Sequence, residues 1–149
     1  MSHLKDRVIM ITGAGSGFGA LLAEGSLARG AKVAALDLSK AGMAERLGEQ
    51  PSLLIHEADV RRRSDLDDAV RSAIDTFGGV DILVNNAGTM PLAFYEDHAI
   101  ASEAWERCID VNIKGVLNGI MAVYDTMIGQ GQGHVVNLSS IYGLSLIHI

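Results

Sequence analysis

The chain has 149 residues, of which 48% are hydrophobic and 20% charged, with 17 glycines and 2 prolines. This length and mixture are typical of one compact α/β domain and exclude a disordered or fibrous protein. The formal net charge of −6, without a lysine- or arginine-rich stripe, argues against nucleic acid or an anionic membrane as the main partner.

The N-terminal stretch MSHLKDRVIMITG turns apolar and then reaches glycine too quickly for a signal sequence or a membrane-spanning helix. The single cysteine, Cys108, cannot form an internal disulfide, and its place in a helical pattern favours the core over a nucleophile. We therefore expect a cytoplasmic protein without a targeting segment.

Five short apolar runs recur along the chain and are predicted to be strands. They cover residues 7–11, 32–37, 52–59, 81–88 and 134–140. Their nearly continuous apolar character suits parallel strands that are covered on both faces. No linker or low-complexity tract divides the chain, so residues 1–149 are expected to form a single domain.

Apolar residues with helical spacing lie between these runs. Three helix faces are predicted: Phe18, Leu21, Leu22 and Gly25; Leu66, Val70, Ala73, Ile74 and Phe77; and Ile113, Val116, Leu117, Ile120, Tyr124, Met127 and Ile128. Ser39 and Ser64 stand where N-caps are expected, with Asp67 completing a weak capping box, and residues 89–102 are expected to be a longer loop. The alternation predicts a Rossmann-like, doubly wound parallel sheet with helices on both faces.

A glycine-rich segment, ITGAGSGFGALL, follows the first predicted strand and opens the first predicted helix. Glycine lets the backbone turn tightly and approach a pyrophosphate, whose charge then meets the helix N-terminus. Two phasings fit, G-x-G-x-x-A from Gly15 and G-x-x-x-G-x-G from Gly13. Both predict a dinucleotide crevice at this turn, and the alternative is a plain connection between strand and helix.

Asp37 ends the second predicted strand, at the distance from the glycines where a carboxylate accepts hydrogen bonds from the adenosine ribose. A carboxylate there repels a 2′-phosphate by roughly 1 to 4 kcal/mol at ~4 Å. Since the glycine loop carries Ser16 rather than a cation, NAD is expected in preference to NADP. The alternative is that Asp37 is an N-cap or a solvated turn residue. Residues 61–64, RRRS, are interpreted as a solvated basic turn rather than a phosphate clamp.

Other chemistries find no support in the sequence. The five histidines have no metal-ligand spacing, so no metal is expected. No G-x-S-x-G motif is present, which argues against a hydrolase of that type.

Six motifs in one order resemble the short-chain dehydrogenase/reductase family, in its compact oxidoreductase branch. They are TGAGSGFG, Asp37, ADV at 58–60, NNAG at 85–88, DVNIKG at 110–115 and HVVNLSS at 134–140. The resemblance covers residues 7 to 143, and it implies that Asp59 accepts a hydrogen bond from the adenine amine and that Asn85 ties neighbouring strands together. The implied cofactor-binding residues are Gly13, Ser16, Gly17, Phe18, Gly19, Asp37, Asp59, Val60, Asn86, Ala87 and Gly88.

The resemblance also implies a reaction, in which hydride moves between the nicotinamide of NAD and a small alcohol or ketone. In the family a serine holds the substrate oxygen, an asparagine contributes to a water-linked proton path, and a tyrosine transfers the proton. A lysine four residues after that tyrosine lowers its pKa. The serine maps to Ser140 and the asparagine to Asn112.

The family's Tyr-x-x-x-Lys pattern does not occur in this sequence, because Tyr142 is followed at the fourth position by Leu146. We therefore expect an incomplete domain of about five strands, with an exposed sheet edge and a tendency to aggregate or to need a partner. Residues 144–149 are expected to be a non-native tail. The parent is expected to be a homo-oligomeric enzyme, and the alternative for this chain is an inactive nucleotide-binding fragment or dimerisation module.

Overall fold

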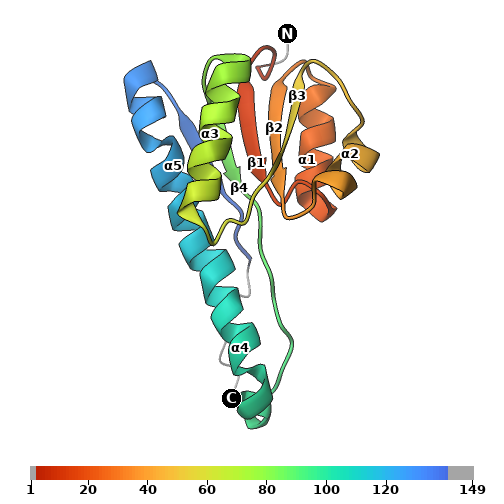
Figure 1. The fold of residues 1–149 in the computed structure, drawn as a ribbon, viewed down its shortest axis with the longest axis vertical. Coiled ribbons are helices and arrows are strands. Elements are labelled where there is room, and N and C mark those ends of the chain that lie inside the picture. The colour runs from red at the N-terminus through yellow and green to blue at the C-terminus, as the bar shows by residue number, and fades with distance from the viewer. Residues whose placement is uncertain (1–2, 141–149) are drawn as a thin grey trace.

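The computed structural model describes residues 3–140, and Figure 1 shows their arrangement. Five strands form one sheet in the order β3-β2-β1-β4-β5, and every neighbouring pair is parallel. The strands are β1 (Val8–Thr12), β2 (Lys32–Asp37), β3 (Leu53–Glu57), β4 (Ile82–Asn85) and β5 (His134–Asn137). The predicted Rossmann-like parallel sheet is thereby confirmed, while Tyr142 and the predicted tail lie outside the described residues.

Helices cover both faces of the sheet, with α1 and α2 on one side and α3 and α5 on the other (Figure 1). A π-helical turn joins α4 directly to α5, and α4 extends past the body of the sheet. The helical segments are α1 (Gly17–Leu27), α2 (Lys40–Leu47), α3 (Arg63–Phe77), a 3-10 turn (Tyr95–Asp97), α4 (His98–Ile109), the π turn (Asp110–Lys114) and α5 (Gly115–Gln130).

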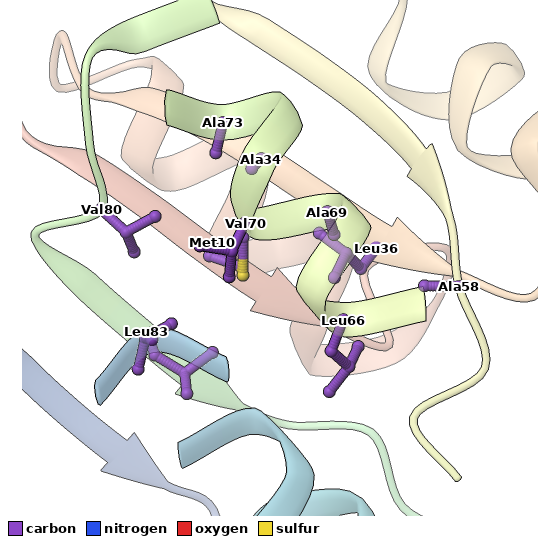
Figure 2. Packing of buried hydrophobic residues seen from close by; sticks show 11 residues of the cluster. Met10, Ala34, Leu36, Ala58, Leu66, Ala69, Val70, Ala73, Val80 and Leu83 are labelled. Atoms are coloured by element: carbon purple, nitrogen blue, oxygen red, sulfur yellow. The ribbon is translucent and has the colours of Figure 1, made fainter. Parts of the chain in front are cut away.

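The sheet carries a hydrophobic core on each face. On one face, shown in Figure 2, Met10, Leu36 and Leu83 of the strands pack with Leu66 and Val70 of α3. On the other face, strand residues that include Ile11 form a second cluster with α1 and α2. Every residue of β1 is buried, so the turn that follows this central strand starts from a fixed point.

The apolar face predicted for α1 does not pack against the sheet. Phe18 and Leu21 are 75% and 55% exposed, whereas the buried residues of this helix are Gly19, Ala20, Ala23 and Ser26. The physical reason is the close approach of the helix to the loop before it, because a Cβ on Gly19 would collide with the Gly13 carbonyl oxygen. Only small side chains fit there, and a search for large apolar residues selects the opposite face.

The predicted face of α3 is largely confirmed, since Leu66, Val70 and Ala73 are buried. That of α5 is only partly confirmed, because Met127 packs against the core but most of the predicted face is exposed. The buried residues of α5 are Gly115, Gly119 and Val123. The α5 outer stripe, which continues into the π turn, is instead exposed and consists of Ile113, Leu117, Met121, Tyr124 and Ile128. Small residues again mark the side of the helix that approaches the sheet.

Two local predictions about helix starts differ in outcome. Ser39 caps α2, because its hydroxyl accepts a hydrogen bond from the Gly42 N–H at 3.4 Å. Ser64 does not cap α3, because Arg62 takes the N-cap position. The Asp65 carboxylate in the first turn accepts a hydrogen bond from the Asp59 N–H. The predicted loop 89–102 is also too long, because α4 already begins at His98.

Two glycines of α5 provide a test of how closely this helix packs. Gly119→Ala should destabilise the fold by about 1 to 3 kcal/mol, because the new Cβ would collide with the Asn85 side chain. Gly129→Ala is the matched control in the same helix, with no atom of the described residues within 4 Å of its added Cβ. It should stabilise the fold by up to about 1 kcal/mol through helix propensity alone. Urea denaturation followed by circular dichroism measures both, and shifts of the same sign would contradict the packing.

Candidate functional site

The carboxyl ends of the strands open onto a groove with a volume of about 660 Å³. Its walls come from the β1–α1 turn, from the residues after β2, β3 and β4, and from α4 and the π turn. Ten of the predicted site residues line it: Gly13, Ser16, Gly17, Phe18, Asp37, Asp59, Val60, Asn86, Ala87 and Gly88. Gly19, Asn112 and Ser140 are not among the lining residues.

The turn after β1 is fastened to the turn after β4. The Thr12 hydroxyl accepts hydrogen bonds from the backbone N–H groups of Asn86 (3.0 Å) and Ala87 (3.1 Å). In return, the Asn86 side-chain amide donates to the carbonyl oxygens of Thr12 (2.9 Å) and Gly13 (3.1 Å). Hydrogen bonds to the turn after β4 therefore fix the glycine loop in addition to its own backbone conformation.

Different glycines of the loop serve different needs. Gly13 has a φ of +69°, and a Cβ there would lie 2.9 Å from the Ala87 Cα, while a Cβ on Gly15 would lie 2.9 Å from Asp37 Oδ2. Gly17 has a φ of +51°, yet no atom of the described residues lies within 4 Å of its Cβ position. Gly13 and Gly15 thus shape the loop, whereas Gly17 leaves space on the groove side.

The N-terminus of α1 has free hydrogen-bonding capacity and positive partial charge that suit an anionic ligand. The Ser16 side chain makes no capping hydrogen bond within residues 3–140, and no acidic residue stands in the first turn. The N–H groups of a helix start carry partial positive charge and favour a phosphate. The arrangement therefore fits the pyrophosphate of a dinucleotide.

Asp37 braces this loop from the end of β2. Its Oδ2 accepts a hydrogen bond from the Gly15 N–H at 2.8 Å, and its Oδ1 accepts one from the Leu38 N–H at 2.7 Å. Each carboxylate oxygen has capacity for a further hydrogen bond. The N-cap alternative is excluded because Ser39 occupies that position of α2. The role of Asp37 towards a ribose stays a prediction.

Asp59 and Arg61 form an ion pair in the groove wall. Arg61 Nη2 lies 2.6 Å from Asp59 Oδ2, and the Arg61 Nε and backbone N–H also donate to this carboxylate. The donated hydrogen bonds from Arg61 lower the pKa of Asp59, and the carboxylate raises the pKa of Arg61. The interpretation of residues 61–64 as a solvated basic turn agrees with the exposure of Arg61 and Arg62, and Arg61 in addition lines the groove. Arg62 and Arg63 pair at the surface with Asp65 and Asp67.

This ion pair predicts a pH dependence of stability. A carboxylate whose pKa is lowered by folding stabilises the fold above its ordinary pKa of 3.8, and this stabilisation is lost as the pH falls through the folded value. Asp59→Asn should therefore be less stable than the wild type at pH 7, and the difference should shrink below pH 3.8. Urea midpoints from pH 7 down to acid measure the effect. Asp68→Asn, which removes only an exposed pair with Arg71, should not produce a gap that closes in acid.

Asn112 lies in the π-helical turn, a feature often found at functional sites. Its Oδ1 accepts from the Thr89 N–H at 2.9 Å, and its Nδ2 donates to the Thr89 carbonyl at 2.8 Å. The Cys108 thiol, which is half-buried rather than a full member of the core, donates to the same carbonyl at 3.3 Å. Asn112 therefore fixes Thr89, which lines the groove next to Gly88.

Ser140 follows β5 at the end of the sheet where the groove opens. The strand is anchored there by Asn85, whose Nδ2 donates to Asn137 Oδ1 at 2.8 Å and whose carbonyl accepts from the Leu138 N–H. The implied strand-tying role of Asn85 agrees with this geometry. Ser140 itself lies three residues beyond β5 and is exposed, and its catalytic role stays a prediction.

Sequence reasoning missed several residues of the site. Thr12 could have been found from its position, because a hydroxyl at the end of a buried strand, directly before a glycine turn, needs a hydrogen-bond partner. Glu103, Arg107 and Val111 recur at intervals of four, which places them on one helix face towards the groove. No pattern in the sequence distinguishes Arg61 from the two arginines that follow it.

Residues 3–140 contain no metal-ligand cluster and no helix suited to cross a membrane. In this part of the chain, no group of three or more histidine, cysteine, aspartate or glutamate residues has an arrangement that would hold a metal ion. None of the helices described there combines the length and apolar character that crossing a membrane requires.

A parallel sheet with a glycine turn after its central strand and a groove between β1 and β4, where the strand order reverses, defines a doubly wound α/β protein with its ligand site at this switch point. The sequence model of the family described as short chain dehydrogenase matches residues 7–148, and the chain belongs to this family. The resemblance predicted from the six motifs is thereby confirmed. Family membership implies a nicotinamide cofactor, NAD or NADP.

Similar proteins are known from staphylococci. The chain is 38% identical to an uncharacterized oxidoreductase of Staphylococcus saprophyticus, over 96% of this chain and 58% of the relative. It is 36% identical to an uncharacterized oxidoreductase of Staphylococcus aureus strain MW2, over 98% of this chain and 63% of the relative. The chain thus spans less than two thirds of the length of these relatives.

Proposed function

We propose that the groove binds NAD and that the chain is the cofactor-binding part of an oxidoreductase that acts on a small alcohol or ketone. The observation that carries this proposal is the Asp37 carboxylate, which lines the groove and holds the glycine loop through the Gly15 N–H. The cations that line the groove, Arg61 and Arg107, are each paired with an acidic residue, Asp59 and Glu103. Neither offers an uncompensated charge to a 2′-phosphate, which favours NAD over NADP.

The order of the strands suggests how the cofactor lies. The pyrophosphate would meet the start of α1 beside Gly17, and the adenosine ribose would meet Asp37 at the end of β2. The adenine would then lie towards the end of β3, and the nicotinamide towards Asn86 to Thr89 after β4. When bound, the nicotinamide supplies the hydride chemistry, and the protein orients it.

Two residues of the chain are proposed to act on the substrate side. Ser140, beyond β5, would hold the substrate oxygen, and Asn112 would support the proton path from the π turn. The tyrosine and lysine of the family pattern do not occur in the 149 residues. We therefore propose cofactor binding for this chain, and the oxidoreductase activity for a protein of the relatives' length that contains it. Because of this missing pattern, a nucleotide-binding module without catalysis is the second candidate.

Calorimetric titration of the chain with NAD and with NADP tests the proposal, and an assay of carbonyl reduction with NADH separates the two candidates. One molecule of NAD per chain, bound more tightly than NADP, supports the cofactor assignment. Turnover supports an enzyme, and binding without turnover in this chain supports the module. A folded chain that binds neither nucleotide would overturn both.

A further inference from the structure

We propose that Asn118 of α5 is a positioning residue of the dinucleotide site, because it holds the groove-wall residue Val60 in place. This inference rests on the proposed function and adds to it the helix that fixes the adenosine end of the groove. Val60 lines the groove after β3, whereas Asn118 is not among the lining residues. Asn118 therefore acts on the cofactor only through Val60.

One hydrogen bond joins the two residues. Asn118 Nδ2 donates to the Val60 carbonyl oxygen at 2.9 Å, although the residues are 58 positions apart in the sequence. Within residues 3–140, it is the only hydrogen bond that Val60 makes. Both residues are half-buried, so the bond is partly shielded from water. Loss of the amide would leave this carbonyl without its protein partner.

The first turn of α5 lies directly against Val60. A Cβ added to Gly115 would lie 2.7 Å from Val60 Cγ2, so glycine is needed for this approach. Gly115 and Asn118 are three residues apart and share one face of the helix. From Gly115 to Val123, Asn118 is the only residue whose side chain carries an amide or a charge. Asparagine is a poor helix former, and the hydrogen bond to Val60 gives a physical reason for its presence here.

This contact connects the two sides of the groove. Val60 follows β3, while α5 packs against β4, on the other side of the switch point. Next to Asn118, Gly119 lies so close to Asn85 of β4 that an added Cβ would collide with the asparagine side chain. The helix is therefore fixed on β4 and holds Val60 from there. The bond thus sets where the wall after β3 stands relative to the turn after β4.

A second hydrogen bond ties α5 to the segment after β3, but outside the groove. Arg63 Nη2 donates to the Met121 carbonyl oxygen at 3.1 Å, and Arg63 also pairs with Asp67. Neither Arg63 nor Met121 lines the groove. Removal of this second bond loosens the packing of α3 on α5 without removing the bond to Val60. It can therefore separate a general loss of helix packing from the loss of the Val60 contact.

The test is a titration of the chain with NAD, with ADP-ribose and with nicotinamide mononucleotide, which lacks the adenosine half. Asn118→Leu should weaken NAD and ADP-ribose by about three- to tenfold, the factor that one hydrogen bond is worth, and leave nicotinamide mononucleotide unchanged. Leucine favours a helix more than asparagine does, so this variant should keep its fold. Circular dichroism measures whether it does.

Two further variants separate the hydrogen-bond donor from the shape of the side chain. Asn118→Asp keeps the shape but presents only acceptors to the Val60 carbonyl, so it should lose at least as much affinity for ADP-ribose as Asn118→Leu. Asn118→Gln keeps the amide on a longer chain and should recover part of the affinity. Arg63→Ala is the matched control and should bind all three ligands like the wild type.

The outcomes distinguish this inference from the proposed function. Full affinity for ADP-ribose in Asn118→Leu or Asn118→Asp would overturn the inference, and so would an equal loss in Arg63→Ala. An equal loss for ADP-ribose and nicotinamide mononucleotide would also overturn it, because the effect would not be confined to the adenosine end. A wild-type chain that binds none of the three ligands would instead overturn the proposed function, and this inference with it.

Discussion

Gly17→Ala is expected to weaken NAD binding by at least about thirtyfold, equivalent to about 2 kcal/mol. The Cβ position of Gly17 is free of protein atoms of the described residues, and the residue lines the groove where α1 begins. An added methyl group would occupy space that the pyrophosphate needs for close contact with the backbone N–H groups. Titration calorimetry of the variant measures the loss.

Gly48→Ala is the matched control for this prediction. Gly48 also has a positive φ, +69°, and its Cβ position also lies in open space with respect to the described residues. Both substitutions therefore place an alanine at a positive φ, which costs roughly 1 to 3 kcal/mol in stability. Gly48 ends α2 outside the groove, so its variant should bind NAD like the wild type. Equal losses in the two variants, or full binding by Gly17→Ala, would show that the dinucleotide does not lie against this loop.

Asp37→Asn is expected to shift the preference from NAD towards NADP by about ten- to a hundredfold. The removed charge repels a 2′-phosphate by roughly 1 to 4 kcal/mol at ~4 Å, depending on screening. The asparagine oxygen still accepts one of the two backbone hydrogen bonds that Asp37 accepts, from Gly15 or Leu38. The other N–H group then faces an amide, so affinity for both cofactors should fall.

The ratio of the NAD and NADP affinities separates the effect of the lost charge from the effect of a distorted loop. A distorted glycine loop weakens NAD and NADP alike, whereas the lost repulsion acts on NADP only. Asp81→Asn offers the same chemical change at the other end of the sheet, where Asp81 pairs with Arg7 and accepts from the Val8 N–H. It should leave the ratio unchanged. A constant ratio in Asp37→Asn would contradict the assignment of Asp37 to the adenosine ribose.

Much of the fold could be predicted because the strands are apolar along their whole length. The run at residues 32–37 coincides with β2, the last three runs each contain a strand, and the run at 7–11 covers all of β1 except its last residue, Thr12. The inner faces of α1 and α5 could not be predicted in the same way. Where a helix comes close to a loop or strand, glycine and alanine form the contact, as at Gly19 and Gly119, and hydrophobic periodicity gives them little weight.

The candidate site was predictable at the level of its segments, because parallel strands bring the turns after them to one edge of the sheet. The side-chain contacts at that edge of the sheet could not be predicted from the sequence. It cannot show that Asp37 braces Gly15, or that Arg61, of three consecutive arginines, turns to Asp59. Such contacts depend on side-chain direction in three dimensions, which spacing does not determine.

The link between Thr12 and Asn86 has a consequence for how the protein is made. These residues are 74 positions apart, and their hydrogen bonds fix the glycine turn to the segment that follows β4. During synthesis the first βαβ unit leaves the ribosome before β4 exists, so its turn then lacks this support. Affinity for the dinucleotide should accordingly arise late in translation, once the segment around Asn86 has docked. A nascent chain that ends before Asn86 should bind the dinucleotide only weakly.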